Sequence, residues 1–85
     1  MEKTISEKKV RDGDIVKVLY KENGWSTIWI IGEIKFLERS PMLSRNDAVI
    51  RYQYNERVEK LDGFDFGIFI ETPKILEVYV LKKQR

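Results

Sequence analysis

Hydrophobic and polar residues alternate with a period of two along most of this chain. Between Ile15 and Tyr20, the side chains of Val16, Val18 and Tyr20 share one parity. Four later stretches alternate in the same way, within residues 25–38, 48–54, 64–70 and 75–81. Successive side chains of a β-strand point to opposite faces, so the pattern predicts five short strands and no amphipathic helix.

Residues that favour turns separate these stretches. Asp12-Gly13-Asp14 precedes the first strand, and Asn23-Gly24 lies between the first two. Asn-Gly between apolar runs predicts a β-hairpin with a type I′ turn, because both residues tolerate a positive φ. Gly32, inside the long second stretch, predicts a bulge or a sharp bend. Proline and polar residues predict a loop over residues 39–47.

Five strands joined by tight turns predict an all-β protein, a small five-stranded antiparallel barrel or roll. The chain has 85 residues, enough for one domain. We expect a single β-barrel domain over residues 12–82 and a basic tail at 83–85. Residues 1–11 are highly charged, with Ile5 and Val10 as the large apolar side chains after Met1, and we expect a mobile arm or a short lead-in.

Three segments resemble the Src-homology-3-like barrels, the Tudor and KOW group in particular. Residues 13–18 (Gly-Asp-Ile-Val-Lys-Val) are similar to the opening strand, and Gly32-Glu33-Ile34 ends a Trp-bearing strand. Residues 49–52 (Val-Ile-Arg-Tyr) are similar to the third strand. The resemblance spans roughly Asp12 to Leu61. The second strand is longer than in Tudor domains, and no clear acidic-aromatic turn of methyl-lysine or methyl-arginine readers is present, so no functional residue is carried over.

Histidine and cysteine are both absent. Disulfides, thiolate metal sites and histidine-based or Cys–His catalysis are therefore excluded. Neither acidic pair, Asp12/Asp14 or Asp62/Asp65, has the ligand count of a calcium loop, and turn chemistry accounts for both. We expect no enzyme activity, no cofactor and no metal. The apolar run 28–31 is too short to span a bilayer, so we expect no membrane association and a cytoplasmic location.

Trp25 and Trp29 are the most informative aromatic residues. Trp29 has the parity of Lys35, and Lys17 and Arg51 project from the same face if neighbouring strands align. A tryptophan bordered by three cations predicts a platform for nucleic-acid bases or a phosphate-bearing ligand. An ordinary solvated face with cross-strand charge pairs explains the same residues.

Phe69 and Tyr79 have the opposite parity to the main apolar faces of their strands, so we expect both to be exposed. With Ile75 and Leu81 they are candidates for an apolar patch, which favours a protein partner or self-association. Alternatively, Ile5 or Val10 covers that patch.

Sixteen basic and fourteen acidic residues give a net charge of +2, weak support for phosphate binding. We therefore expect a protein-interaction or accessory module. The alternative is a nucleic-acid-binding barrel that uses the aromatic-basic face. The candidate binding residues are Lys17, Trp25, Trp29, Lys35, Arg51, Phe69 and Tyr79.

Overall fold

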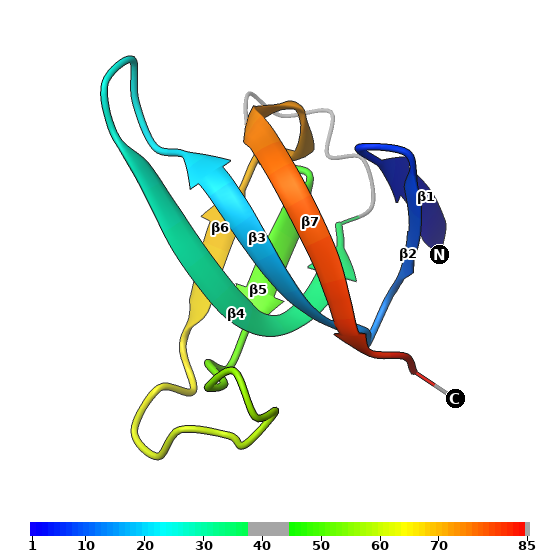
Figure 1. Cartoon of the computed structure of the whole chain (residues 1–85), viewed down its shortest axis with the longest axis vertical. Coiled ribbons are helices and arrows are strands. Elements are labelled where there is room, and N and C mark those ends of the chain that lie inside the picture. Colours follow the sequence, from blue (N-terminus) through cyan, green and yellow to red (C-terminus); the bar gives the residue numbers. More distant parts are fainter. Residues whose placement is uncertain (38–44, 85) are drawn as a thin grey trace.

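The computed structural model describes residues 1–37 and 45–84 (Figure 1). The expected end of the second strand at Glu38, most of the loop expected at 39–47, and Arg85 of the basic tail lie outside this description. The elements are β1 (Glu2–Ile5), β2 (Lys8–Arg11), β3 (Ile15–Lys21), β4 (Thr27–Phe36), β5 (Ala48–Arg51), β6 (Gly67–Ile70), the 3₁₀ turn η1 (Thr72–Lys74) and β7 (Ile75–Lys82).

The prediction of an all-β protein with a five-stranded antiparallel sheet is confirmed. The strand order is β6-β5-β4-β3-β7, and every neighbouring pair is antiparallel. β6 and β7 are the two edges, and among the described residues no pairing joins them, so the sheet is curled but open (Figure 1).

The core lies on the concave side of this sheet and has the parity that the alternation predicts. Val16, Val18 and Tyr20 of β3 are buried, as are Ile30, Ile34 and Phe36 of β4. β4 is long enough to pair with β3 over residues 27–33 and with β5 over residues 33–36, so it links both halves of the sheet. The strand curves strongly between these two pairings (Figure 1).

Gly32 lies where another segment of the chain passes close to the backbone of β4. Its register with Val16 is uninterrupted, so of the two predicted features, a bulge or a sharp bend, the bulge is absent, while β4 curves strongly (Figure 1). A Cβ atom at Gly32 would lie 2.2 Å from the carbonyl oxygen of Tyr52 and 2.4 Å from Cγ2 of Ile50. Glycine is needed here because the chain leaving β5 crosses directly over β4, where the N–H of Tyr54 donates to the carbonyl of Ile31 at 2.9 Å.

The bulges lie between β3 and β7 instead. The register shifts between Leu19 and Tyr20, so that Tyr20 faces Ile75 and Leu76 is left without a partner on β3. Such a shift reverses side-chain parity beyond it. Ile75 therefore enters the core and Leu76 is exposed, the reverse of the arrangement that strict alternation predicts.

β5 is shorter than the predicted strand over 48–54. It ends at Arg51 because Tyr52 has a positive φ of 65°, which no regular strand contains. The following segment is neither a continued strand nor a helical turn. Oδ1 of Asn55 accepts hydrogen bonds from the N–H groups of Arg57 and Glu59, and Tyr54 bridges to Lys60. The fourth predicted strand likewise begins only at Gly67.

Residues 2–11, where the sequence predicts a mobile arm or a short lead-in, form the β1–β2 hairpin. Its two-residue turn consists of Ser6 and Glu7, with φ values of 49° and 67°, as a type I′ turn requires. Ile5 and Val10 are buried and belong to the same core cluster as β3 and β4. Because most of the residues around Ile5 and Val10 are charged, the composition of this segment does not indicate that it contributes to the core.

The β3–β4 hairpin is present where Asn23-Gly24 predicts it, but with a different turn. Neither Asn23 nor Gly24 has a positive φ, so the turn is not type I′. Oδ1 of Asn23 instead accepts hydrogen bonds from the N–H groups of Trp25 and Ser26, and the backbone bond from Glu22 N–H to Ser26 closes a longer loop. The hydrogen bonds of the Asn23 side chain, rather than a positive φ in its backbone, therefore stabilise this turn.

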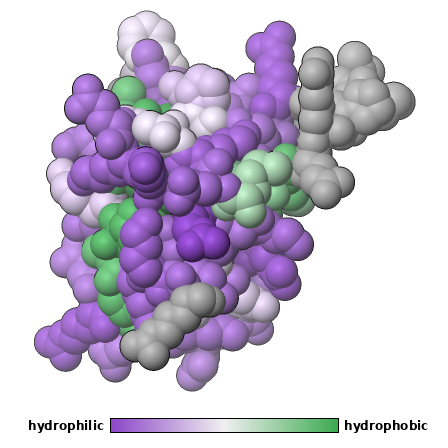
Figure 2. All heavy atoms as spheres, turned by 90° about the vertical axis from the view of Figure 1, so that its right-hand side faces the viewer, coloured by the Kyte–Doolittle hydropathy of each residue, from purple (hydrophilic) through white to green (hydrophobic). Residues whose placement is uncertain are grey.

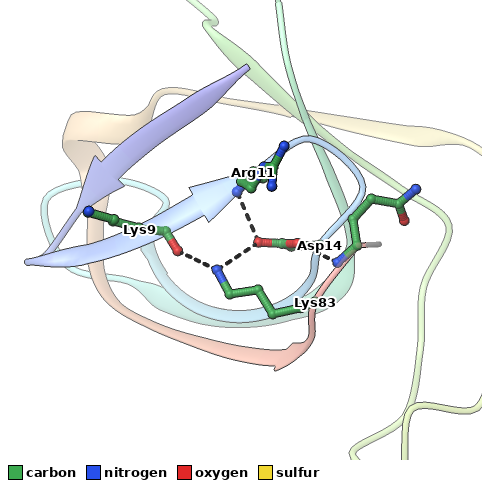
Figure 3. A network of polar contacts seen from close by, with 5 residues as sticks. Lys9, Arg11, Asp14 and Lys83 are labelled. Carbon is green, nitrogen blue, oxygen red and sulfur yellow. Dashed lines mark hydrogen bonds and ion pairs between the residues drawn. The ribbon is translucent and has the colours of Figure 1, made fainter.

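Two aspartates of the predicted 12–14 turn join distant segments. Asp14 is fully buried, and its carboxylate accepts hydrogen bonds from the N–H groups of Arg11 and Gln84 and from Nζ of Lys83 (Figure 3). Asp12 accepts from the N–H of Phe36 at 2.8 Å. Both carboxylates are therefore structural. The side of the molecule that carries the hairpin is mainly hydrophilic (Figure 2).

Candidate interaction face

The convex face of the sheet carries most of the predicted binding residues. Register places Lys17 opposite Ile31 and Arg51 opposite Glu33, so both share the face of Trp29 and Lys35, as strand alignment predicts. These side chains point away from the core on β4 and its two neighbours.

Four residues on this face form a cation–aromatic stack, which we define as Lys8, Tyr79, Trp29 and Lys17. Nζ of Lys17 lies 4.8 Å from the ring centroid of Trp29. The rings of Trp29 and Tyr79 are 6.2 Å apart with an interplanar angle of 32°. Nζ of Lys8 lies 4.3 Å from the ring centroid of Tyr79. Three separate strands and the N-terminal hairpin thus build one continuous surface.

Both aromatic rings of the stack remain accessible. Trp29 is 49% exposed and Tyr79 is 41% exposed, although each contacts a cation and the other ring. Aromatic side chains held in a fixed position by such neighbours offer large contact areas with little rotamer entropy to lose. The stack is therefore suited to binding a flat or apolar group.

The cation of Lys17 is already paired. Its Nζ donates to Oε1 of Glu56 at 2.7 Å, and Glu56 reaches it from the Asn55 turn. The hydrogen bond and positive charge of Lys17 lower the pKa of the Glu56 carboxyl below its ordinary value. At the other end, the hydroxyl of Tyr79 donates to Glu77 at 3.0 Å, and this bond and the charge of Glu77 raise the pKa of Tyr79. The stack is therefore bounded by carboxylates as well as by cations.

A cleft of about 440 Å³ opens beside Trp29. Its walls combine the exposed edge of β4 with the segment that follows β5. The polar lining comes from Lys17, Gln53 and Glu56, and the remaining lining residues are Ile28, Trp29, Ile30, Ile31, Tyr54 and Ile68. A cleft that joins an apolar floor to one cation and one carboxylate matches mixed-charge ligands better than polyanions.

The expected cluster of three cations around Trp29 is not formed. Of these three cations, Lys17 is the one that lies over the ring. The guanidinium carbon of Arg51 lies 5.4 Å from the ring centroid of Tyr52, where Nζ of Lys60 also lies at 4.1 Å. Lys35 is exposed, six residues from Trp29 along β4, which corresponds to roughly 20 Å in an extended strand.

The predicted exposed aromatics are exposed but dispersed. Trp25 is 95% exposed near the tip of the β3–β4 hairpin, and Phe69 is 60% exposed on β6. Phe69 and Tyr79 lie on the two opposite edge strands of the sheet, and Ile75 is buried in the core. The expected patch of Phe69, Tyr79, Ile75 and Leu81 is therefore not present as one surface. Neither Ile5 nor Val10 covers it, because both are core residues.

Sequence reasoning did not identify Lys8 and Glu56 as parts of this face. Lys8 lies in the hairpin that was expected to be an arm, and Glu56 lies in a segment with no clear alternation. One available signal was Asn55, whose side chain caps the following turn and so directs Glu56 toward β3.

Other kinds of site lack support. Across residues 1–37 and 45–84, no group of three or more acidic, histidine or cysteine side chains could hold a metal ion. No helix in this part of the chain is long and apolar enough to cross a membrane. Comparison with protein-family models, with curated proteins and with solved structures finds no match.

Proposed function

We propose that this chain is a non-enzymatic protein-interaction module whose contact surface is the cation–aromatic stack and the adjoining cleft. The observation that carries this proposal is the pairing of Trp29 and Tyr79, two half-exposed aromatic rings held 6.2 Å apart on the convex face. Exposed, positioned aromatic residues are the side chains that most often dominate protein–protein binding energy.

The charges around the stack favour a protein over a nucleic acid. Phosphate binding needs cations that are free to replace counterions. Lys17 is held by Glu56 at 2.7 Å, Lys60 pairs with Asp65 at 3.4 Å, and Glu33 directly faces Arg51 across the β4–β5 pair. A surface in which carboxylates alternate with cations attracts a polyanion less than an unpaired basic patch does, and it suits a partner of mixed charge.

Nucleic-acid binding remains the second candidate because Lys17 lies over the face of Trp29. A base that stacks on Trp29 would have this ammonium group at its edge. We also propose a cytoplasmic location and a relationship to the Src-homology-3-like barrels. The strand order of the curled sheet and the long, shared β4 support that relationship.

The experiment that tests this function is capture from an extract of the source cells, performed with and without nuclease. We expect the full chain to retain one or more specific proteins after nuclease treatment. Trp29→Ala and Tyr79→Ala should each lose these proteins, because each substitution removes one ring of the stack. Trp25→Ala is the matched control, since it removes an even more exposed tryptophan, near the tip of the β3–β4 hairpin.

Three results would contradict the proposal. Loss of all retained protein on nuclease treatment would favour the nucleic-acid candidate. So would retention on heparin or single-stranded DNA at about 0.1 M salt that falls steeply as salt is added. Equal capture by Trp29→Ala and the unsubstituted chain would place the contact surface elsewhere.

A further inference from the structure

Two strands face each other in this molecule without pairing. β2 pairs only with β1, and β7 pairs only with β3, so within residues 1–37 and 45–84 each has one free edge. The two strands descend beside one another (Figure 1), and contacts from Lys8 to Tyr79 and from Lys83 to Lys9 place them together in space. We call the space between them the β2–β7 gap.

Side chains, rather than backbone hydrogen bonds, span this gap. Nζ of Lys83 donates to the carbonyl oxygen of Lys9 at 2.9 Å, and Figure 3 shows this side chain reaching across from the end of β7. A hollow of about 200 Å³ lies in the gap, and a second hollow of about 360 Å³ adjoins it at Ser6, between β1 and η1. The smaller hollow is lined by Ser6, Lys8 and residues 76–79 of β7. The gap is therefore a groove with a strand on each side.

The backbone of β2 directs polar groups into the groove. Ser6 and Glu7 form a two-residue turn, so Ile5 and Lys8 are the hydrogen-bonded closing pair of the hairpin. Thr4 and Lys9 are then a non-hydrogen-bonded pair, in which the N–H and C=O of Lys9 point away from β1. The carbonyl of Lys9 does so, since it accepts from Lys83. Further along β2, the backbone N–H of Arg11 donates to the carboxylate of Asp14, and the carbonyl oxygen of Arg11 accepts from the N–H of Asp14.

Positive charge dominates the two strands that form the rim of the groove. On β2 and the residue before it, and on β7 and the residue after it, the exposed cations are Lys8, Lys9, Arg11, Lys82 and Lys83, whereas the exposed carboxylates are Glu7 and Glu77. Lysine on a free strand edge discourages pairing with another copy of the same edge, because the second copy presents the same charges. A strand that carries acidic residues meets attraction at this rim.

We propose that the β2–β7 gap is the docking site for an extended, acidic segment of a partner protein, which pairs with the free edge of β7 as an added strand. This inference rests on the proposed interaction function and specifies the chemistry of the partner. β7 has eight residues, twice the length of β6, and offers the longer free edge of the sheet. The incoming strand displaces Lys83 from the carbonyl of Lys9, and the surrounding ammonium groups pair with its carboxylates.

The groove connects with the cation–aromatic stack through two residues. Lys8 and Tyr79 belong to both, because their contact crosses the gap while Tyr79 packs against Trp29. A partner whose strand lies on β7 would thus place neighbouring residues over Trp29. One binding surface then provides backbone pairing for affinity and aromatic contacts for selectivity.

The test uses the full ¹⁵N-labelled chain and four capped peptides of eight residues, the length of β7. The first alternates Glu and Val, the second has Lys in place of Glu, and the third is the acidic peptide with alternate amides N-methylated along one edge. A second N-methylated version blocks the other edge. We expect the acidic peptide to shift and protect the amides of β7 and Lys9, and to bind about tenfold tighter than the basic peptide.

N-methylation on the edge facing β7 should weaken binding by about tenfold, because it removes the strand's hydrogen-bond donors without changing the charge. Lys9→Glu combined with Lys82→Glu should reverse the preference between acidic and basic peptides. Lys35→Glu is the matched control, an exposed lysine on β4 away from the gap.

The inference would be overturned by no shifts with the acidic peptide, by equal binding of the acidic and both N-methylated peptides, or by burial of β7 in a dimer of this chain. Shifts confined to Trp29 and Lys17 would also refute strand addition while agreeing with the proposed function. Protection along β7 together with unchanged protein capture by Trp29→Ala would support strand addition and contradict the proposed role of the cation–aromatic stack. The two proposals therefore fail in distinguishable ways.

Discussion

The carboxylate of Asp14 accepts a hydrogen bond of 2.7 Å from the backbone N–H of Gln84, although 70 residues separate them in the chain. The same carboxylate accepts from the N–H of Arg11 at 2.9 Å, so one buried side chain connects β2, the start of β3 and the end of β7. Lys83 adds an ammonium group at 3.5 Å (Figure 3). Both sides of the β2–β7 gap are thereby fixed at their lower end.

Asp14→Ala should lower the free energy of unfolding by about 3 kcal/mol, because two backbone donors lose a charged, buried acceptor. Asp14→Asn should cost less, since its carbonyl oxygen keeps one acceptor. Urea unfolding at neutral pH measures both. Asp62→Ala, in an exposed turn, is the control and should have little effect. A loss below about 0.5 kcal/mol for Asp14→Ala would contradict the role assigned to this network.

Stability should fall in acid partly because of Asp14. Burial raises the pKa of this carboxyl, but the N–H groups of Gln84 and Arg11 and the charge of Lys83 together lower it below the ordinary value of 3.8. A group with a depressed pKa in the folded state stabilises the protein above its unfolded pKa, and this contribution is lost as pH falls through the folded pKa. The loss should therefore occur below about pH 4.

Comparison with Asp14→Asn isolates this contribution, because all other carboxylates titrate in both proteins. The difference in unfolding free energy between the two should shrink as pH falls from about 5 to 2. Parallel curves over this range would mean that Asp14 does not titrate with folding.

Gly32→Ala should destabilise the protein by more than about 3 kcal/mol or prevent folding. The added Cβ would lie 2.2 Å from the carbonyl oxygen of Tyr52, a backbone atom that cannot move without displacing the chain that leaves β5. Gly24→Ala is the matched control, because nothing lies within 4 Å of a Cβ at that position and its φ is not positive. Thermal unfolding of the two variants tests the crossing directly. Similar midpoints would show that the crossing has room for a methyl group.

Glu7→Gly should stabilise the protein by about 0.5–1 kcal/mol. Glu7 has a φ of 67°, which costs a residue with a side chain roughly 1–2 kcal/mol, and the gain is reduced by the greater chain entropy of glycine. Glu22→Gly, at a turn residue without a positive φ, should instead destabilise slightly. Chemical denaturation distinguishes the two. An equal effect of both substitutions would argue against a left-handed turn at the N-terminal hairpin.

Lys17→Glu should lower the thermal midpoint, because it places a second carboxylate beside Glu56. Adding Glu56→Lys should restore it, since the exchanged pair regains opposite charges at the same positions. Lys35→Glu should change stability by less than about 0.5 kcal/mol, because this exposed side chain has no ion pair within the described residues. Salt should reduce the effect of Lys17→Glu by screening. Failure of the double substitution to recover stability would show that the pair is incidental.

Local pattern was enough to identify β3, most of β4, and the sheet's inward-facing residues. Val16, Val18, Ile30 and Ile34 are buried because alternation is a property of each strand and needs no knowledge of its neighbours. The same reasoning failed at Ile75 and Leu76, where a bulge against β3 reverses the parity. No residue in that stretch marks a bulge, since the shift arises from fitting two curved strands together.

The candidate site was predictable only in part for the same reason. Parity alone places Lys17, Trp29 and Tyr79 on the convex face. The contacts of Lys8 with Tyr79 and of Glu56 with Lys17 join residues 71 and 39 positions apart. Such contacts depend on how far the sheet curls and on where the hairpin and the Asn55 turn are fixed.

By itself the sequence determined that this protein is all-β, that it lacks histidine and cysteine chemistry, and which side of most strands faces the core. Those properties follow from residue type and spacing of two, which act within one strand. Tertiary structure decided that Ile5 and Val10 belong to the core, that the edge strands β6 and β7 do not pair with each other within the described residues, and that Trp29 contacts Tyr79. Each of these features depends on the curvature and the register of several strands together, and a short stretch of sequence determines neither.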